Sequence, residues 1–152
     1  MRKFAAVAVG VVIVVAGMLS GTAAQAEQTL HPDIEYALAQ EPGGVVVNDT
    51  TVLWPELGMT LQVQDVGFGI RAVGSCATGR VCAYRSANLT GSMLSWTSCG
   101  TFSTSALAGV GSIANARSSG TLQARNGTTV VATAGANGSA NVFGVVTNVR
   151  CF

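Results

Sequence analysis

Acidic side chains are missing from the second half of this 152-residue sequence. All seven lie at or before Asp65, and the single histidine, His31, also lies in that early region. Serine-nucleophile catalysis needs a base and an orienting carboxylate, glycosidases need two facing carboxylates, and calcium prefers several carboxylate oxygens. Residues 66–152 supply none of these groups. We therefore expect neither enzymatic activity nor a metal ion or other cofactor.

Lysine and aromatic residues are also scarce, with Lys3 as the only lysine and aromatics at 6%. After residue 65 the positive charge comes from scattered arginines, namely Arg71, Arg80, Arg85, Arg117, Arg125 and Arg150. Nucleic-acid binding needs a denser basic footprint, so we expect no nucleic-acid partner. The uneven charge instead predicts an acidic flank folded against a basic domain.

Residues 1–26 have the pattern of a secretory signal peptide. A positive start, Met1-Arg2-Lys3, precedes an apolar run over 4–19 and small residues ending in Ala24-Gln25-Ala26. We expect cleavage after Ala26, with a second possible position after Ala24. An uncleaved anchor is the alternative, but the run of about 16 residues is short for a bilayer span. The prediction is a secreted, extracellular protein without membrane contact after cleavage.

All four cysteines follow the signal peptide, and an even count in a small exported protein indicates two disulfides. Three connectivities are open. We favour Cys76–Cys82, which closes a tight loop, and Cys99–Cys151, which ties back the end of the chain. Loop closure makes them worth roughly 2 and roughly 4 kcal/mol respectively. These values are comparable to the whole stability of a small domain.

Residues 27–73 and residues 74–152 differ in pattern. In the first segment, apolar residues at helical spacing after Pro32, with Gly43-Gly44 beyond them, predict a helix over about 31–41. Strands are expected near 45–47, 52–54 and 59–63, and Gly67-Phe68-Gly69 is expected to be a flexible joint. Because this segment is too small to bury its own core, we expect it to pack on the second region or to be a pro-segment removed later.

The second segment, 74–152, is predicted to be a mostly β sandwich or barrel. Short apolar or alternating runs separated by turn residues place strands near 80–84, 92–97, 111–116, 121–125, 128–134 and 141–149. The stretch Ala132–Ala140 is rich in glycine and alanine. We expect this stretch to be an exposed loop.

A family resemblance begins at the first cysteine loop. The sequence there is CATGRVCAYRSANLTG, followed by Ser98-Cys99-Gly100 and then GSIAN. This pattern resembles the secreted actinobacterial inhibitors of peptidase inhibitor family thirty-six, typified by the Streptomyces metalloproteinase inhibitor. The resemblance implies a βγ-crystallin-like Greek-key sandwich, here preceded by a small α+β segment.

Individual residues fill the places of the Greek-key signature. Tyr84, Leu89 and Gly91 match its aromatic, second aromatic and glycine, with leucine as a replacement, while Ser112 and Asn115 match the later serine and the family's asparagine. Leu107-Ala108 stands where crystallins carry calcium ligands, so the resemblance implies no calcium site. The founding inhibitor has a second small disulfide loop that this chain lacks, and no inhibitory loop is carried over from it.

The resemblance implies a monomeric inhibitor that binds a secreted peptidase by presenting a rigid loop. Candidate loops are 77–81, with Arg80 as the target-binding residue, and 134–140. The alternative is a secreted binding or killer-toxin-like β module of the cell envelope or medium, with Trp54, Trp96 and Tyr84 as a sugar platform. A purely structural secreted protein is the third hypothesis.

Overall fold

The computed structural model describes residues 30–64 and 73–152. The expected signal peptide and the expected joint at 67–69 lie outside these ranges. The first range contains α1 (Pro32–Gln40), β1 (Val45–Asn48), β2 (Thr51–Trp54), the short 3-10 helix η1 (Pro55–Leu57) and β3 (Met59–Gln62). The second contains β4 (Val81–Ser86), β5 (Thr90–Trp96), β6 (Thr101–Ser103), β7 (Ser112–Asn115), β8 (Leu122–Asn126), β9 (Thr129–Ala134), β10 (Gly138–Asn141) and β11 (Asn148–Cys151).

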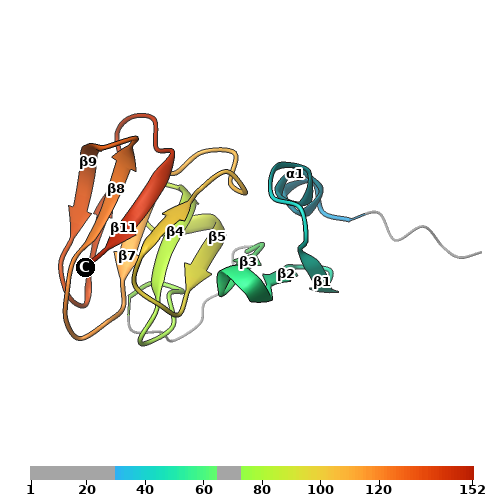
Figure 1. Ribbon diagram of the computed structural model, residues 1–152, viewed down its shortest axis with the longest axis horizontal. Helices are drawn as coiled ribbons and strands as arrows, with labels where there is room; N and C mark the ends of the chain where they lie inside the picture. Colours follow the sequence, from blue (N-terminus) through green and yellow to red (C-terminus); the bar gives the residue numbers. More distant parts are fainter. Residues whose placement is uncertain (1–29, 65–72) are drawn as a thin grey trace, which may run out of the picture.

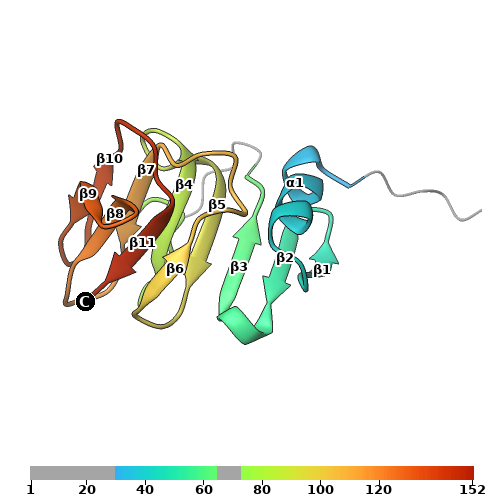
Figure 2. The same ribbon diagram turned by 45° about the horizontal axis from the view of Figure 1, so that its top comes forward.

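Strands β4 to β11 form two four-strand units that exchange their third strands (Figures 1 and 2). Within the first unit, β5, β4 and β7 are neighbours in one sheet, whereas β6 joins the other sheet beside β11. The second unit repeats this pattern: β9, β8 and β11 are neighbours, whereas β10 crosses to pair with β7. This related pair of Greek keys is the βγ-crystallin-like sandwich that the sequence motif implied.

The segment before residue 65 extends one of the two sheets. Strand β3 pairs antiparallel with β5, and β2 and β1 follow, which makes a seven-stranded sheet opposite a four-stranded one. Helix α1 lies against β1–β3 as a second layer beside the four-stranded sheet (Figure 2). Its fully buried residues Ile34 and Ala37 join the same hydrophobic core as Leu61 and Leu94. The front segment therefore gains its core from the sandwich, as its small size requires.

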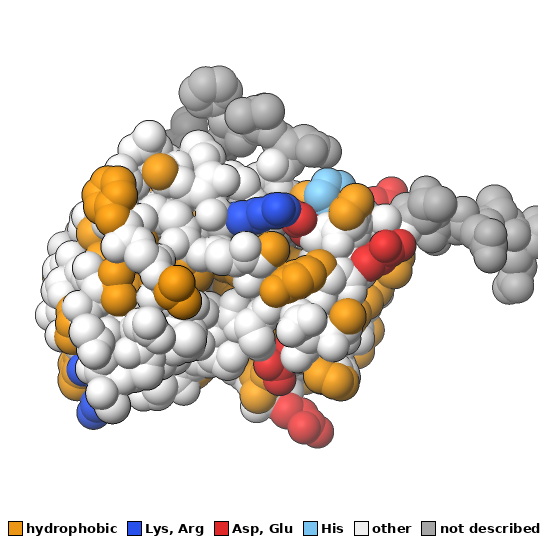
Figure 3. All heavy atoms as spheres, turned by 90° about the horizontal axis from the view of Figure 1, so that it is seen from above, with side chains coloured by type: hydrophobic (Ala, Val, Ile, Leu, Met, Phe, Trp, Pro, Cys, Tyr) orange, Lys and Arg blue, Asp and Glu red, His pale blue; other side chains and the backbone are white. Residues whose placement is uncertain are grey.

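The acidic side chains lie mainly on the segment before residue 65, and some of them contact the sandwich. Acidic side chains gather over the α1–β3 half of the face shown in Figure 3. At the boundary, Asp33 of α1 makes a salt bridge with Arg85 of β4 and accepts a hydrogen bond from the Ser92 hydroxyl of β5. Further along, Glu41 accepts a hydrogen bond from the Ser105 hydroxyl at 2.9 Å. Acidic groups of the front segment thus contact the sandwich directly.

The turn between β4 and β5 is folded over and held by the motif residues. Asn88 and Leu89 both have left-handed backbones, with φ of 58° and 60°. The fully buried Ser112 hydroxyl accepts a hydrogen bond from the Leu89 amide at 2.9 Å and donates one to the Ser86 carbonyl at 2.6 Å. A side chain at Gly111 would overlap the Ser86 carbonyl carbon, 2.5 Å from the position of its Cβ. The turn therefore folds down onto the start of β7.

Two local expectations for the second half are wrong. The stretch Ala132–Ala140 is not a loop, because β9 and β10 occupy most of it and leave only a short turn at 135–137. The expected strand over 141–149 is instead the end of β10, a connection, and β11. Within that connection Phe143 is 88% exposed. The three-residue strand β6 was not expected from the sequence.

Candidate protein-binding surface

Both disulfides lie at the same end of the sandwich, where β4 and β8 begin and β5, β7 and β11 finish. One joins Cys76 to Cys82, and the other joins Cys99 to Cys151, which is the pairing favoured from the sequence. Cys76 and Cys82 are fully buried in a second, smaller core with Tyr84, Met93, Ala114 and Ala116. This core covers part of the outer face of the seven-stranded sheet and anchors the loop between the two cysteines.

That cysteine loop is fixed by backbone hydrogen bonds to the end of β7. The Gly79 amide donates to the Ala116 carbonyl at 2.7 Å, and the Ala116 amide donates to the Arg80 carbonyl at 2.9 Å. At the apex, Thr78 and Gly79 are exposed, and Gly79 has a φ of 82° that favours glycine. The loop therefore presents an exposed backbone in one fixed shape.

The turn at 135–137 is bound to the same place by Arg117. The Asn137 amide donates to the Arg117 carbonyl at 2.9 Å, while the Arg117 guanidinium donates to the carbonyls of Gly79 and Thr97, each at 3.4 Å. The geometry thus unites the two candidate loops of the sequence. We call residues 77–80, 116–117 and 135–137 the two-loop surface.

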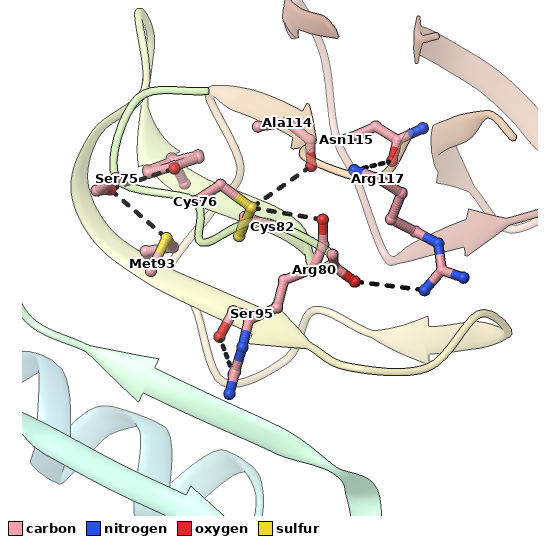
Figure 4. The surroundings of a disulfide bond; sticks show 11 residues. Ser75, Cys76, Arg80, Cys82, Met93, Ser95, Ala114, Asn115 and Arg117 are labelled. Carbon is pink, nitrogen blue, oxygen red and sulfur yellow. Dashed lines mark hydrogen bonds between the residues drawn. A yellow bond between two sulfur atoms is a disulfide. The ribbon is translucent and has the colours of Figure 1, made fainter. Parts of the chain in front are cut away.

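Asn115, the residue matched to the family's asparagine, lies beside Arg117 and is hydrogen-bonded to it (Figure 4). Its side chain is fully buried. Its Oδ1 accepts from the Arg117 amide at 3.2 Å, and its Nδ2 donates to the Gly120 carbonyl at 3.2 Å. Asn115 therefore supports the loops rather than contacting a target.

Arg80 turns away from the loop apex. Figure 4 shows its side chain running toward β5, where Nη1 donates to the Ser95 hydroxyl at 3.1 Å. The guanidinium lines a pocket of about 170 Å³ on the outer face of the seven-stranded sheet. The Arg80 side chain thus points away from the rest of the two-loop surface, whereas its backbone carbonyl takes part in the hydrogen bonds of the loop.

The groups on the two-loop surface are suited to binding and not to proton transfer. Within 77–80, 116–117 and 135–137 the only charged side chains are arginines, and the rest are small or amide-bearing residues. Among the described residues there is no cluster of three or more His, Cys, Asp or Glu side chains placed to hold a metal ion. An arginine guanidinium can recognise a peptide by hydrogen bonds.

One carboxyl has a shifted pKa, and it lies away from this surface. Burial alone raises the pKa of Asp33, but the Ser92 hydroxyl and the Arg85 guanidinium outweigh that effect and hold the pKa below its usual value. The group therefore stays ionised at neutral pH. Its position between α1, β4 and β5 gives it a structural role in holding the front segment.

The sugar-platform hypothesis is wrong, because its three aromatic residues are buried. Trp54 and Trp96 are 2% and 1% exposed, and Tyr84 is fully buried. The Trp54 indole donates to the Glu41 carbonyl at 2.8 Å, and Trp96 stacks on Phe102. These rings therefore stabilise the core and offer no face to a ligand.

The sequence did not single out Arg117, the residue that joins the two loops. Its position two residues after Asn115, at the end of a predicted strand, was the available signal. The contact of Arg117 with the 135–137 turn depends on the crossing of β10 to the other sheet. No local sequence pattern predicts that crossing.

Fold and surface together define a disulfide-linked Greek-key sandwich that presents rigid loops at one end. Residues 69–133 match the family model of peptidase inhibitor family I36. The match spans the cysteine loop and β4 to β8 and ends within β9, and it agrees with the resemblance that the motif residues indicated. The turn at 135–137 lies just beyond the matched region. No curated protein and no solved structure matches the chain significantly.

The described residues contain one α-helix, α1, of nine residues. No helix in the described ranges is long and apolar enough to cross a membrane.

Proposed function

We propose that this chain is a secreted, non-catalytic peptidase inhibitor that binds its target through the two-loop surface. The observation that carries the proposal is the convergence of the two loops on Arg117, where the cysteine loop and Arg117 lie in the region matched to an inhibitor family and the 135–137 turn directly follows it. The expected signal peptide and the two disulfides support export to an oxidising compartment. The bound peptidase is then an extracellular one.

Rigidity is the physical basis of this proposal. A loop that is already ordered loses little conformational entropy when it enters a protease cleft, so more of its contact energy appears as affinity. Here the cysteine loop is closed by one disulfide and bonded to the end of β7, and the 135–137 turn is bonded to Arg117. Arg80 stands at the edge of this surface and is the side chain proposed to contact the outer part of the target.

The experiment is a titration of thermolysin-like metalloproteases and of serine proteases with the purified, oxidised protein. We expect stoichiometric inhibition of at least one class, with the metalloproteases favoured by the resemblance. Arg117→Gln should weaken inhibition roughly tenfold, since it loosens the join between the loops. Arg125→Gln is the matched control, because Arg125 bonds to Gln123 on the four-stranded sheet and lies outside the surface.

Two results would overturn the proposal. Absence of inhibition in both classes at micromolar protein would remove the inhibitory function. Equal inhibition by Arg117→Gln, Arg125→Gln and the parent would keep the function but place the contact elsewhere on the molecule.

A further inference from the structure

The pocket beside Arg80 shares Ala77 and Arg80 with the two-loop surface but also includes residues of β3 and β5. It is lined by residues of β3, β5 and the cysteine loop: Thr60, Gln62, Met93, Ser95, Ala77 and Arg80. Its volume of about 170 Å³ would hold about five or six water molecules. The space therefore suits one small functional group and its stem.

The guanidinium at this pocket has no acidic partner in the part of the chain that the structure describes. The salt bridge found among the described residues joins Arg85 to Asp33, and Arg80 makes no ion pair there. Its side chain donates one hydrogen bond, to the neutral Ser95 hydroxyl. A guanidinium carries five N–H groups, so most of its donors remain available. Within residues 30–64 and 73–152, the partly enclosed positive charge of Arg80 has no ion-pair partner.

The neutral groups around Arg80 can donate as well. Ser95 accepts through its oxygen from Arg80, which leaves its own hydroxyl hydrogen free to be donated into the pocket. Thr60 and Gln62, on the neighbouring strand β3, add a hydroxyl-bearing and an amide-bearing residue to the lining. Below them, Met93 supplies an apolar floor that is 1% exposed. The pocket therefore combines the positive charge of Arg80 with neutral hydrogen-bond donors. None of its lining residues carries a carboxylate that would compete with a ligand for these donors.

We propose that this pocket binds a carboxylate. A planar guanidinium matches the two oxygens of a carboxylate in a bidentate pair, and one positive charge with neutral donors balances a single negative charge. The carboxylate can come from the end of a peptide chain or from an acidic side chain, which share this chemistry. The proposal holds whether or not the protein inhibits a peptidase.

The front segment is part of this site. Thr60 and Gln62 reach the pocket because β3 pairs with β5 across Thr60–Ser95 and Gln62–Met93. Residues 69–133, the region matched to the inhibitor family, contain only the Arg80 and β5 walls of the pocket. The carboxylate site is therefore completed by a segment outside the family match.

The test is a titration of the oxidised full-length secreted protein with four probes, followed by NMR chemical shifts. N-acetylalanine carries the carboxylate of a chain end, and N-acetylaspartate α-amide carries the carboxylate of an acidic side chain. N-acetylalanine amide is the neutral control, and inorganic phosphate is the competing anion. We expect one of the two carboxylates to bind saturably with a Kd on the order of 1 mM, with shifts at Arg80 and Ser95. Whichever carboxylate binds more tightly identifies the source.

Variants make the test specific. Arg80→Gln should weaken carboxylate binding tenfold or more, and Arg125→Gln, which removes the same charge from the four-stranded sheet, should leave it unchanged. Thermal unfolding of Arg80→Gln checks that the fold is kept, and Gln62→Ala provides a second probe of the pocket that leaves the arginine in place. A smaller loss is expected for Gln62→Ala.

The proposal is overturned if neither carboxylate binds, if the neutral amide binds as well, or if phosphate binds more tightly than both carboxylates. It is also overturned if Arg80→Gln keeps parental affinity or if Arg125→Gln loses as much. Because none of these readouts involves a peptidase, failure here is distinct from failure of the inhibition assay.

Discussion

The variant Ser112→Ala removes one hydroxyl oxygen and so tests how much that hydroxyl stabilises the turn between β4 and β5. The Ser112 hydroxyl accepts from the Leu89 amide and donates to the Ser86 carbonyl, and its residue is fully buried. Removing it leaves two backbone groups without a partner, while Leu89 must keep its left-handed backbone at a φ of 60°. At about 1 kcal/mol for each hydrogen bond, the variant should lose about 2 kcal/mol of unfolding free energy.

Two measurements check this value in the oxidised protein. Urea unfolding should show a midpoint lowered by roughly 1 M or more at unchanged slope. Hydrogen exchange should be about thirtyfold faster at the Leu89 amide, because local opening of the turn becomes that much easier. The exchange measurement separates a loosened turn from a general loss of stability.

The second Greek key supplies the control. Asn148, at the corresponding start of β11, donates from Nδ2 to the Gly127 carbonyl at 2.9 Å, but that contact is exposed. Asn148→Ala should therefore cost less than about 1 kcal/mol. The reasoning is refuted if the two variants lose the same free energy, or if Ser112→Ala loses under about 0.5 kcal/mol with the Leu89 amide still protected.

Two further predictions concern the front segment and the cross-links. Because Asp33 has a lowered pKa when folded, its contribution to stability is present above its unfolded pKa, near 4, and is lost as the pH falls through the folded value. Asp33→Asn should flatten the acid side of the stability–pH curve measured by urea unfolding, and the exposed Glu35→Gln should not. Removing the bond between Cys99 and Cys151, which are 52 residues apart, with a double alanine variant should cost about 4 kcal/mol in denaturant unfolding; a loss below about 1 kcal/mol would contradict the loop-closure estimate.

The sequence predicted the front segment well because its signals are local. Helical spacing, Pro32 in the first turn and the glycine pair after the helix correctly predicted α1, and alternation gave β3 within a residue or two. The fold motif was also recognisable in the sequence, since Tyr84, Leu89 and Gly91 occupy its fixed spacing. The fold class followed from these features and from the regular spacing of short strands.

The structural features that the sequence did not predict depend on contacts between segments that are distant in the chain. Strand β10 has the sequence Gly-Ser-Ala-Asn, which has low intrinsic strand preference, and it forms because it pairs with the buried strand β7. The apolar residues Phe143 and Val145 suggested a strand, yet they lie in an exposed connection. The meeting of the cysteine loop, Arg117 and the 135–137 turn depends on this same crossing.

The pairing of β3 with β5 could not be predicted from local patterns either. Burial alternates along β3, whereas the last five residues of β5 are all buried, and nothing in the spacing of either strand selects one partner over another. That pairing sets the surroundings of Arg80, because it places Thr60 and Gln62 in the pocket that the Arg80 side chain lines. Thr60 and Gln62 line the pocket because β3 extends the sheet beside β5.

The most direct test of the binding mechanism is NMR mapping of the labelled protein bound to an inhibited peptidase. The two-loop surface predicts that the largest shift changes fall at 77–80, 116–117 and 135–137. It predicts little change at the opposite end of the sandwich, at Asn126, Gly127 and 142–147. Changes concentrated at that opposite end, with the two-loop surface unaffected, would contradict the account.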